Sequence, residues 1–416
     1  MSVPVTVLSG TLGAGKTTTL KHVLTADHGY EVAVLVNDMG EVNVDAAQIQ
    51  RRVDGDRDVV ELSNGCICCG MQSEFEQAIT ELALEESFEY LLVEPSGISE
   101  PGLIVRQFLD SHVGTFYELS SVTTVVDARQ FYDTFRTGDV SRSERHNDER
   151  RPLSDLIIEG IEFCDTIVLN KTDLVSETEV DDVIELIRTV QPEATLYETT
   201  YGRIDPERVL DPGRFDLETV SNAASWKRAV EHDRKHREDG QTHHGEKHSD
   251  AHTHSDGHAV DSHDEYEHLH PPERYGIDSF VYRRRGPMHP ERLADALRDL
   301  PDSVVRVKGY LHIAGRSEYA FTVSKAGRQT QIEAAGRWIA SLPKAQRERY
   351  REIHQPDWND EYGDRKTELV VIGREIDRDE LGRRLDECLL SDAEGSVEHD
   401  VIENPFPNQN GATVQL

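Results

Sequence analysis

The segment Gly10-Thr-Leu-Gly-Ala-Gly-Lys-Thr17 constrains the fold of this chain more than any other feature. It follows a β-branched apolar run at residues 3–8 and opens a stretch of helical character. In the pattern G-x-x-x-x-G-K-[ST], backbone N–H groups wrap phosphates, the lysine reaches the β- and γ-phosphates, and the hydroxyl group binds Mg²⁺. A chance Gly-rich turn is the alternative, but the order strand, loop, helix favours a phosphate loop. The predicted nucleotide ligands are Gly10, Gly13, Ala14, Gly15, Lys16, Thr17 and Thr18; Lys16 and Thr17 are also predicted to be catalytic, with Thr17 on magnesium.

Residues 1–224 are expected to form a doubly wound, mostly parallel α/β sheet. Apolar, β-branched runs at 3–8, 31–36, 90–93, 122–127 and 166–169 alternate with amphipathic helical stretches such as 73–86 and 177–190. Strands that are buried on both faces and separated by helices are typical of parallel sheets.

Residues 225–274 break this pattern. The stretch 232–270 holds 11 of the 19 histidines among acidic and small residues, with hardly an aliphatic side chain. Such a segment cannot bury a core, so a disordered linker is predicted. Composition favours weak gathering of metal ions by these histidines over a plain hydrophilic linker.

A smaller α+β domain is predicted at residues 275–395, followed by a tail at 396–416. Its expected strands are 277–283, 303–308, 318–323 and 367–372, and its expected helices are 289–299, 328–341 and 377–389. The sequence does not predict the order of these strands.

The composition is strongly acidic, with 79 Asp plus Glu against 45 Lys plus Arg and a formal net charge of −34. This charge argues against binding to nucleic acid or to an anionic membrane surface. Only 10 of the basic residues are lysine, and a carboxylate-rich, lysine-poor surface is typical of a chain from a halophile, because concentrated salt screens its self-repulsion. No signal peptide or membrane-spanning run is recognisable, so a cytoplasmic location is expected.

Two further segments complete a predicted nucleotide site. Asn170-Lys171-Thr-Asp173 follows an apolar strand, where the Asp carboxylate can accept hydrogen bonds from guanine N1 and N2 that adenine does not offer. This favours GTP over ATP. Glu94 ends the run Leu91-Leu-Val-Glu94-Pro-Ser-Gly97 and can hold Mg²⁺ through water or orient the attacking water, while Gly97 lets a backbone N–H approach the γ-phosphate.

Three of the five cysteines, Cys66, Cys68 and Cys69, lie within four residues. Neighbouring cysteines pair poorly in disulfides, so thiolate ligation of Zn²⁺ or Cu(I) in a reducing compartment is predicted. No second C-x-x-C supplies a fourth ligand, which predicts an open site suited to metal transfer. Cys164 and Cys388 are predicted to be core residues, and His289 and His312 to be packing or capping residues.

These motifs, in this order, resemble the CobW-type metallochaperone P-loop GTPases. Val36-Asn-Asp-Met-Gly-Glu-Val-Asn-Val-Asp45, Val125-Val-Asp-Ala128, Arg306-Val-Lys-Gly309 and Gly363-Asp-Arg365 support the resemblance over nearly the whole chain. It implies a GTPase that uses GTP and Mg²⁺, binds zinc or a related metal at the cysteines, and delivers it to a client metalloprotein; a homo-oligomer is left open. Asp38 stands where the family usually has Glu, which puts a metal-ligand role there in doubt, and Asp45 is a candidate for positioning magnesium.

Two other functions share the same phosphate loop. A P-loop kinase would transfer phosphate to a small molecule, and a non-catalytic metal buffer would bind metal without GTP turnover. The Asn170–Asp173 segment and the absence of an obvious Arg-rich lid favour the GTP-hydrolysing metallochaperone.

Overall fold

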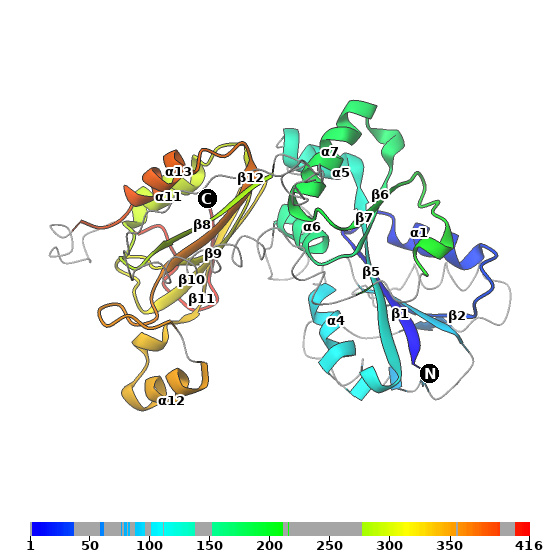
Figure 1. Cartoon of the computed structure of the whole chain (residues 1–416), viewed down its shortest axis with the longest axis horizontal. Helices are drawn as coiled ribbons and strands as arrows, with labels where there is room; N and C mark the ends of the chain where they lie inside the picture. Colours follow the sequence, from blue (N-terminus) through cyan, green and yellow to red (C-terminus); the bar gives the residue numbers. More distant parts are fainter. Residues whose placement is uncertain are drawn as a thin grey trace, which may run out of the picture.

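The computed structural model of this 416-residue chain describes residues 2–36, 59–61, 76, 79, 80, 82, 83, 88–95, 101–110, 112–137, 152–210, 215, 277–354, 357–391 and 404–416. These residues form one parallel and one antiparallel sheet, each covered by helices (Figure 1). None of the helices described in these ranges is long and apolar enough to cross a lipid bilayer.

The N-terminal sheet is parallel throughout its described strands, as the sequence predicts. In the order β3-β2-β4-β1-β5-β6-β7, every neighbouring pair runs parallel. Strands β2, β4 and β6 are buried along their whole length, which explains their continuous apolar sequences. The strands are β1 (Val3–Gly10), β2 (Val32–Val36), β3 (Val59–Glu61), β4 (Tyr90–Glu94), β5 (Tyr117–Asp127), β6 (Thr166–Asn170) and β7 (Thr195–Glu198).

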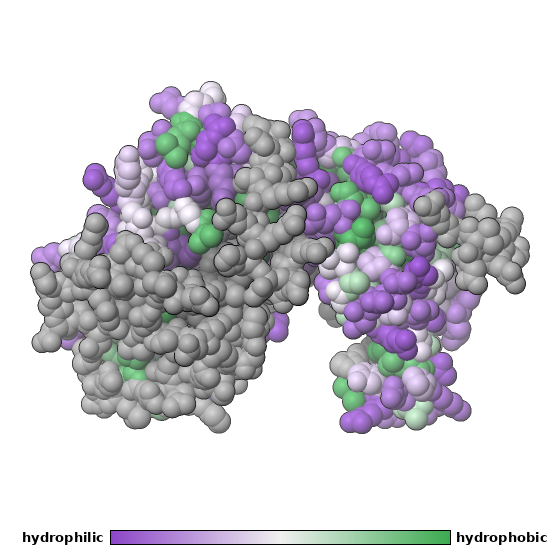
Figure 2. Space-filling model, turned by 180° about the vertical axis from the view of Figure 1, so that it is seen from behind, coloured by the Kyte–Doolittle hydropathy of each residue, from purple (hydrophilic) through white to green (hydrophobic). Residues whose placement is uncertain are grey.

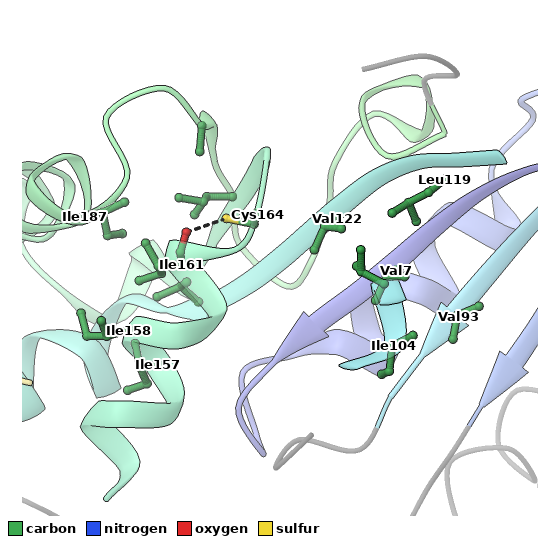
Figure 3. Close-up of a cluster of buried hydrophobic side chains, with 14 of the residues drawn as sticks. Val7, Val93, Ile104, Leu119, Val122, Ile157, Ile158, Ile161, Cys164 and Ile187 are labelled. Carbon is green, nitrogen blue, oxygen red and sulfur yellow. Dashed lines mark hydrogen bonds between the residues drawn. The ribbon is translucent and has the colours of Figure 1, made fainter. Parts of the chain in front are cut away.

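Helices cover both faces of this sheet, as expected for a doubly wound fold. Helix α1 packs against one face, while α4, α6 and α7 pack against the other. Figure 3 shows part of the second core, where Ile157, Ile158 and Ile161 of α6 lie among strand residues such as Val122. The helices are α1 (Lys16–Thr25), α4 (Pro101–Asp110), α5 (Ala128–Tyr132) with its π-helical extension η3 (Asp133–Thr137), α6 (Leu153–Glu162) and α7 (Glu177–Val190); short 3₁₀ turns are η2 (His112–Thr115), η4 (Thr172–Leu174) and η5 (Pro206–Arg208).

The strand order determines where a ligand can bind. Strand β1 lies between β4 and β5, and the carboxyl ends of parallel strands meet at one edge of the sheet. The loop after β1, Glu94 at the end of β4, Asp127 at the end of β5 and Asn170 at the end of β6 therefore share that edge. In open α/β sheets ligands bind in the crevice outside these ends.

The C-terminal domain is built on an antiparallel sheet of six described strands in the order β13-β11-β10-β9-β12-β8. Helices α11 (Pro290–Arg298) and α13 (Arg378–Asp386) pack on one face, and α12 (Lys344–His354) projects away from the domain (Figures 1 and 2). The strands are β8 (Ile277–Arg284), β9 (Val304–Leu311), β10 (Tyr319–Ala326), β11 (Gln329–Arg337), β12 (Thr367–Arg374) and β13 (Thr413–Gln415), and the 3₁₀ turn η6 spans Ile339–Ser341.

One predicted helix of this domain is wrong. The helix expected at residues 328–341 is largely strand β11, which pairs with β10 through a tight turn at Gly327. Thr330, Ile332 and Ala334 are buried while the residues between them are more exposed, which is the period of two of a strand. The Gln, Glu and Ala residues of this segment favour helix, but propensity is a weak prior that strand pairing overrides.

The sequence predicts a separate tail at residues 396–416. Residues 404–416, which the structure describes, instead belong to the C-terminal domain. Strand β13 pairs antiparallel with β11, and Phe406 is buried in the core of the domain. The pairing covers backbone groups at one edge of the sheet that would otherwise be unpaired.

The two domains dock through a buried cluster of charges. Arg306 on β9 is fully buried, and its guanidinium donates to Asp155 at 2.8 Å and to Glu162 at 2.9 Å, both on α6. Burial by itself lowers the pKa of Arg306, but Glu162 and Asp155 outweigh it and raise that pKa above its usual value. Ser324 of β10 also donates to Asp155. Helix α6 therefore contacts the C-terminal domain through carboxylates that keep the arginine charged.

Candidate functional site

The loop Gly10–Thr17 joins β1 to α1 in the conformation that the motif predicts. Gly10 has a φ of +140°, and a Cβ there would lie 2.3 Å from the Val125 carbonyl oxygen of the neighbouring strand. Gly15 is left-handed at a φ of +107° and immediately precedes α1. Only glycine fits both positions without strain or collision.

Lys16 and Thr17 face different partners at the start of α1. The Lys16 ammonium is buried and donates to the carbonyl oxygens of Gly10 at 2.9 Å and Thr11 at 3.3 Å, so it bends back over the loop. The Thr17 hydroxyl donates to Glu94 Oε1 at 3.1 Å, bringing together a hydroxyl and a carboxylate that lie 77 residues apart. Thr18, also predicted to bind nucleotide, is exposed.

The Asn170–Asp173 segment is hydrogen-bonded directly to the phosphate loop. Asn170 Nδ2 donates to the Ala14 carbonyl at 3.0 Å, and Asn170 Oδ1 accepts from the Gly202 amide at 2.9 Å. The Lys171 ammonium donates to the Gly13 carbonyl at 2.7 Å. Asp173 is exposed on η4, where its carboxylate is accessible. The structure thus brings two predicted motifs, which lie far apart in the sequence, into one site.

Some residues of this site were not predicted as ligands. Asp127 accepts a hydrogen bond from Lys171, and Gln130 Oε1 accepts from the Thr11 hydroxyl at 2.9 Å. Gly202, on the loop after β7, completes the contacts of Asn170. Asp127 could have been recognised from the sequence, because its carboxylate ends a buried apolar strand in the segment Val125–Ala128. No comparable sequence pattern marks Gln130 or Gly202.

A small cavity of about 20 Å³ lies behind the first residues of the phosphate loop. This volume holds roughly one water molecule. Its walls come from Ser9–Thr11, the end of β5, Gln130, Pro101 and the middle of α6. Helix α6 therefore contributes both to the cavity beside the phosphate loop and to the domain interface.

Several predicted site residues lie outside the described part of the chain: Gly97, Asp38, Asp45, Cys66, Cys68 and Cys69. Among the residues that the structure does describe, no group of three or more His, Cys, Asp or Glu side chains could hold a metal ion. The zinc site therefore stays a prediction.

The isolated cysteines and histidines confirm their predicted structural roles. Cys164 and Cys388 are buried, and burial raises the pKa of both thiols. His289 precedes α11 and its ring accepts from the Arg292 amide, as a capping residue does. His312 is packed in the interior.

Residues 4–198 match the family described as CobW/HypB/UreG, nucleotide-binding domain, and residues 277–389 match the cobalamin synthesis protein cobW C-terminal domain. Zinc-regulated GTPase metalloprotein activator 1 of Dictyostelium discoideum is 33% identical over 423 residues, which cover 94% of this chain and 81% of that protein. The chain belongs to the CobW family. It is accordingly a P-loop GTPase, which confirms the resemblance inferred from its motifs.

Other CobW relatives match over shorter ranges. Zinc chaperone YjiA of Escherichia coli is 34% identical over 224 residues, covering 52% of this chain and 63% of that protein. Zinc chaperone CobW of Sinorhizobium is 27% identical over 327 residues, covering 76% and 82%. The crystal structure of Zn(II)-bound YjiA covers 94% of this chain and all of its own at 19% identity, but with a TM-score of 0.38 it adds nothing to the sequence matches.

Proposed function

We propose that this CobW-family GTPase is a cytoplasmic metallochaperone that binds zinc at Cys66, Cys68 and Cys69 and passes it to a client metalloprotein. The names of its relatives, which include zinc chaperones and a zinc-regulated GTPase, support this proposal. Three cysteines within four residues also suit soft thiolate ligation in a reducing compartment.

The observation that carries the proposal is the position of the carboxyl end of strand β3, which precedes the cysteines in the chain. Strand β3 ends at Glu61, five residues before Cys66, and it runs parallel to β2 and β4. Its carboxyl end therefore lies at the edge that also carries Glu94 and the phosphate loop. A metal held by this segment would be attached at the same edge of the sheet as the proposed GTP site.

On the nucleotide side, we assign Lys16 to the phosphates and Asp173 to the guanine base. Thr17 and Glu94 suit magnesium, because a hydroxyl and a buried carboxylate 3.1 Å apart are the hard oxygen donors that this ion prefers. Magnesium bound there would neutralise charge on the β- and γ-phosphates. We also assign Glu94 to orienting the attacking water and the N–H of Gly97, three residues further along the chain, to the γ-phosphate.

We further propose that GTP hydrolysis controls zinc release. The γ-phosphate holds switch loops in P-loop GTPases, and these loops relax after hydrolysis. Here the cysteine segment follows β3 and the Glu94–Gly97 segment starts at the end of β4, on the two sides of β2 in one sheet, so relaxation of one segment can alter the other through β2. Zinc affinity should then depend on which nucleotide is bound.

A zinc titration against a chromophoric chelator tests this coupling with GTP and Mg²⁺, with GDP and Mg²⁺, and without nucleotide. Zinc affinity should differ between the GTP and GDP states, and the triple variant Cys66→Ala, Cys68→Ala, Cys69→Ala should lose the nucleotide-sensitive zinc. Cys388→Ala, which removes a cysteine from the C-terminal core, is the matched control and should keep it. Identical zinc affinity in all three nucleotide states would contradict the coupling.

Product analysis separates this function from the alternatives. A metallochaperone releases inorganic phosphate from GTP, whereas a small-molecule kinase transfers phosphate to an added acceptor. A non-catalytic buffer predicts that Lys16→Ala leaves zinc handling unchanged in the presence of GTP. The metallochaperone predicts that Lys16→Ala removes the difference between nucleotide states.

A further inference from the structure

We propose that Asp127 is a positioning residue of the nucleotide site. Its carboxylate holds the Lys171 ammonium against the phosphate loop, so that carbonyl oxygens of that loop face away from the phosphates. The inference rests on the nucleotide site proposed above and extends it to a side chain that was not among the predicted ligands.

The contacts of Asp127 link two strands and two loops. Asp127 is the last residue of β5 and lies beside Asn170 in the parallel register of β5 and β6. Its Oδ2 accepts from the Lys171 ammonium at 2.6 Å, and the same ammonium donates to the Gly13 carbonyl at 2.7 Å. The Asp127 side chain is 11% exposed and the Lys171 side chain 32%, so water screens this ion pair less than it screens a pair on the open surface.

Lys171 needs such a partner to stay in place. A lysine carries a single charge on a flexible four-carbon stem, and fixing that stem costs rotamer entropy. The backbone of Lys171 is also left-handed, at a φ of +60°, a conformation that non-glycine residues rarely adopt. A short, partly shielded contact with Asp127 offsets both costs and holds the ammonium over Gly13.

The result is a fixed orientation of two successive peptide groups. Lys171 holds the Gly13 carbonyl, and Asn170 Nδ2 holds the Ala14 carbonyl at 3.0 Å. Because a trans peptide is planar, a carbonyl turned to one side cannot also face the other. The negative ends of both peptide dipoles are therefore kept from the side on which an anionic phosphate would approach.

The second oxygen of Asp127 supports the loop from another direction. Oδ1 accepts from the Gln130 amide at 3.0 Å and so caps α5. The Gln130 side chain then accepts from the Thr11 hydroxyl. One carboxylate thus connects to the phosphate loop through Lys171 at Gly13 and through Gln130 at Thr11.

The test compares Asp127→Asn with the wild-type chain by equilibrium titration of fluorescent GDP and a non-hydrolysable GTP analogue. Asparagine has one acceptor oxygen, and while this oxygen caps α5 its Nδ2 faces the Lys171 ammonium, so the ion pair and its hydrogen bond are both lost. Since a charge-assisted hydrogen bond is one of the strong kinds, its loss should lower the affinity for both nucleotides by about tenfold and by the same factor. KM for GTP should rise accordingly, while kcat stays within about twofold of wild type, because the lost contact acts on binding of both nucleotides alike.

The salt dependence of nucleotide affinity distinguishes a positioning role of Asp127 from a direct electrostatic effect of its charge on the nucleotide. Removing a carboxylate near an anionic ligand should by itself raise affinity, and this gain disappears at 1 M salt, where the screening length is about 3 Å. The loss in Asp127→Asn should therefore be at least as large at 1 M as at 0.1 M salt. In a Lys171→Met background, Asp127→Asn should have little further effect, because its action passes through that lysine.

Asp165→Asn is the matched control. Asp165 also links β5 to β6, through the Val122 amide at 2.7 Å, but it lies just before the first residue of β6, away from the carboxyl ends of the strands. The Asp165→Asn variant should have a lower melting temperature than the wild type and unchanged nucleotide affinity. Equal losses of affinity in both variants, or nucleotide affinity within twofold of wild type in Asp127→Asn, would overturn the proposal. Lys16→Ala tests the site itself: if it leaves nucleotide affinity unchanged, the proposed nucleotide site fails, whatever Asp127→Asn shows.

Discussion

At the scale of single residues, Gly15 is the point where the phosphate loop meets the Asn170–Asp173 segment. A Cβ at Gly15 would lie 2.3 Å from Asn170 Nδ2, the nitrogen that holds the Ala14 carbonyl. A side chain there would strain the backbone and also separate the two segments. The contact between them therefore depends on the absence of one methyl group.

Gly15→Ala should weaken GDP binding far more than Gly13→Ala. Both glycines have positive φ values, +107° and +79°, so each alanine carries backbone strain of about 1–3 kcal/mol. At Gly13, however, an added Cβ meets nothing within 4 Å. Isothermal titration with GDP, together with thermal unfolding of both variants, measures the difference. Similar losses of affinity in the two variants would show that strain, and not the collision with Asn170, controls the site.

His312 is a histidine that stays neutral in the folded chain. Its ring nitrogens lie 2.9 Å from the Arg285 carbonyl oxygen and 3.3 Å from Ser317 Oγ. Burial lowers the pKa of His312 from 6.5 to about 4, although the contact with Arg285 opposes this shift. Between these two values the unfolded chain binds a proton that the folded chain does not.

The free energy of unfolding should therefore rise between pH 4 and pH 6.5 and be lost as the pH falls through this window. The contribution of His312 is at most about 3 kcal/mol. His312→Gln should flatten the pH dependence of urea unfolding in the C-terminal domain, followed by tryptophan fluorescence from pH 4.5 to 7. A slope identical to that of the wild type would contradict this account.

At the scale of elements, sequence reasoning succeeded where local signals and packing agree. Helix α7 spans residues 177–190 as predicted, because its amphipathic pattern begins at a capping box formed by Ser176 and Glu179. The sequence predicts a helix in place of strand β11 because the surface positions of this strand carry helix-favouring residues. Its partners are β10, across the turn at Gly327, and β13, which is distant in sequence. Pairing that depends on tertiary structure leaves a weak trace in the sequence.

The candidate site divides in the same way. Gly10–Thr17, Glu94 and Asn170–Asp173 were recognisable because each is a short pattern at the end of a predicted strand. Gln130 and Gly202 were not, since their roles arise only when β5, β6 and the loop after β7 meet the phosphate loop. The sequence thus predicts the residues assigned to nucleotide binding more readily than the residues that position these side chains and loops.

The described C-terminal residues 404–416, which include β13, give a prediction at this scale. Phe406→Ala should destabilise the C-terminal domain by about 3–5 kcal/mol, because the ring is buried against Phe321 and other core residues. Ile353→Ala on α12 is the control, since that side chain is 60% exposed and its loss should change stability by less than about 0.5 kcal/mol. Differential scanning calorimetry reports both. Equal melting temperatures of the two variants would mean that residues 404–416 are dispensable for the fold.

At the scale of the whole molecule, Arg306, Asp155 and Glu162 decide how the two domains are joined. Removing one partner of a buried ion pair leaves a charge without compensation, which costs more than the pair itself contributes. The cluster makes few other arrangements of α6 against β9 acceptable, because each carboxylate would lose its arginine. It therefore specifies the docking geometry more than it adds stability.

Arg306→Met should destabilise the chain by about 3–5 kcal/mol and separate the unfolding of the two domains into distinct calorimetric transitions. Arg374→Met is the matched control: Arg374 also pairs across the interface, with Glu185, but both side chains are about one-third exposed, so the loss should be about 0–1 kcal/mol. Adding Asp155→Asn and Glu162→Gln to Arg306→Met should recover part of the stability. A single, unshifted transition in Arg306→Met would refute the role of the cluster.

The position of this cluster along the chain has a consequence for the histidine-rich segment. The interface joins α6 to β9, whereas the covalent connection between the domains runs through residues 211–276. We therefore expect the domains to stay associated when that connection is cut. A chain cut by protease within residues 225–274 should elute as one particle at protein concentrations well above the dissociation constant of the interface, so docking places little demand on the residue types of this segment.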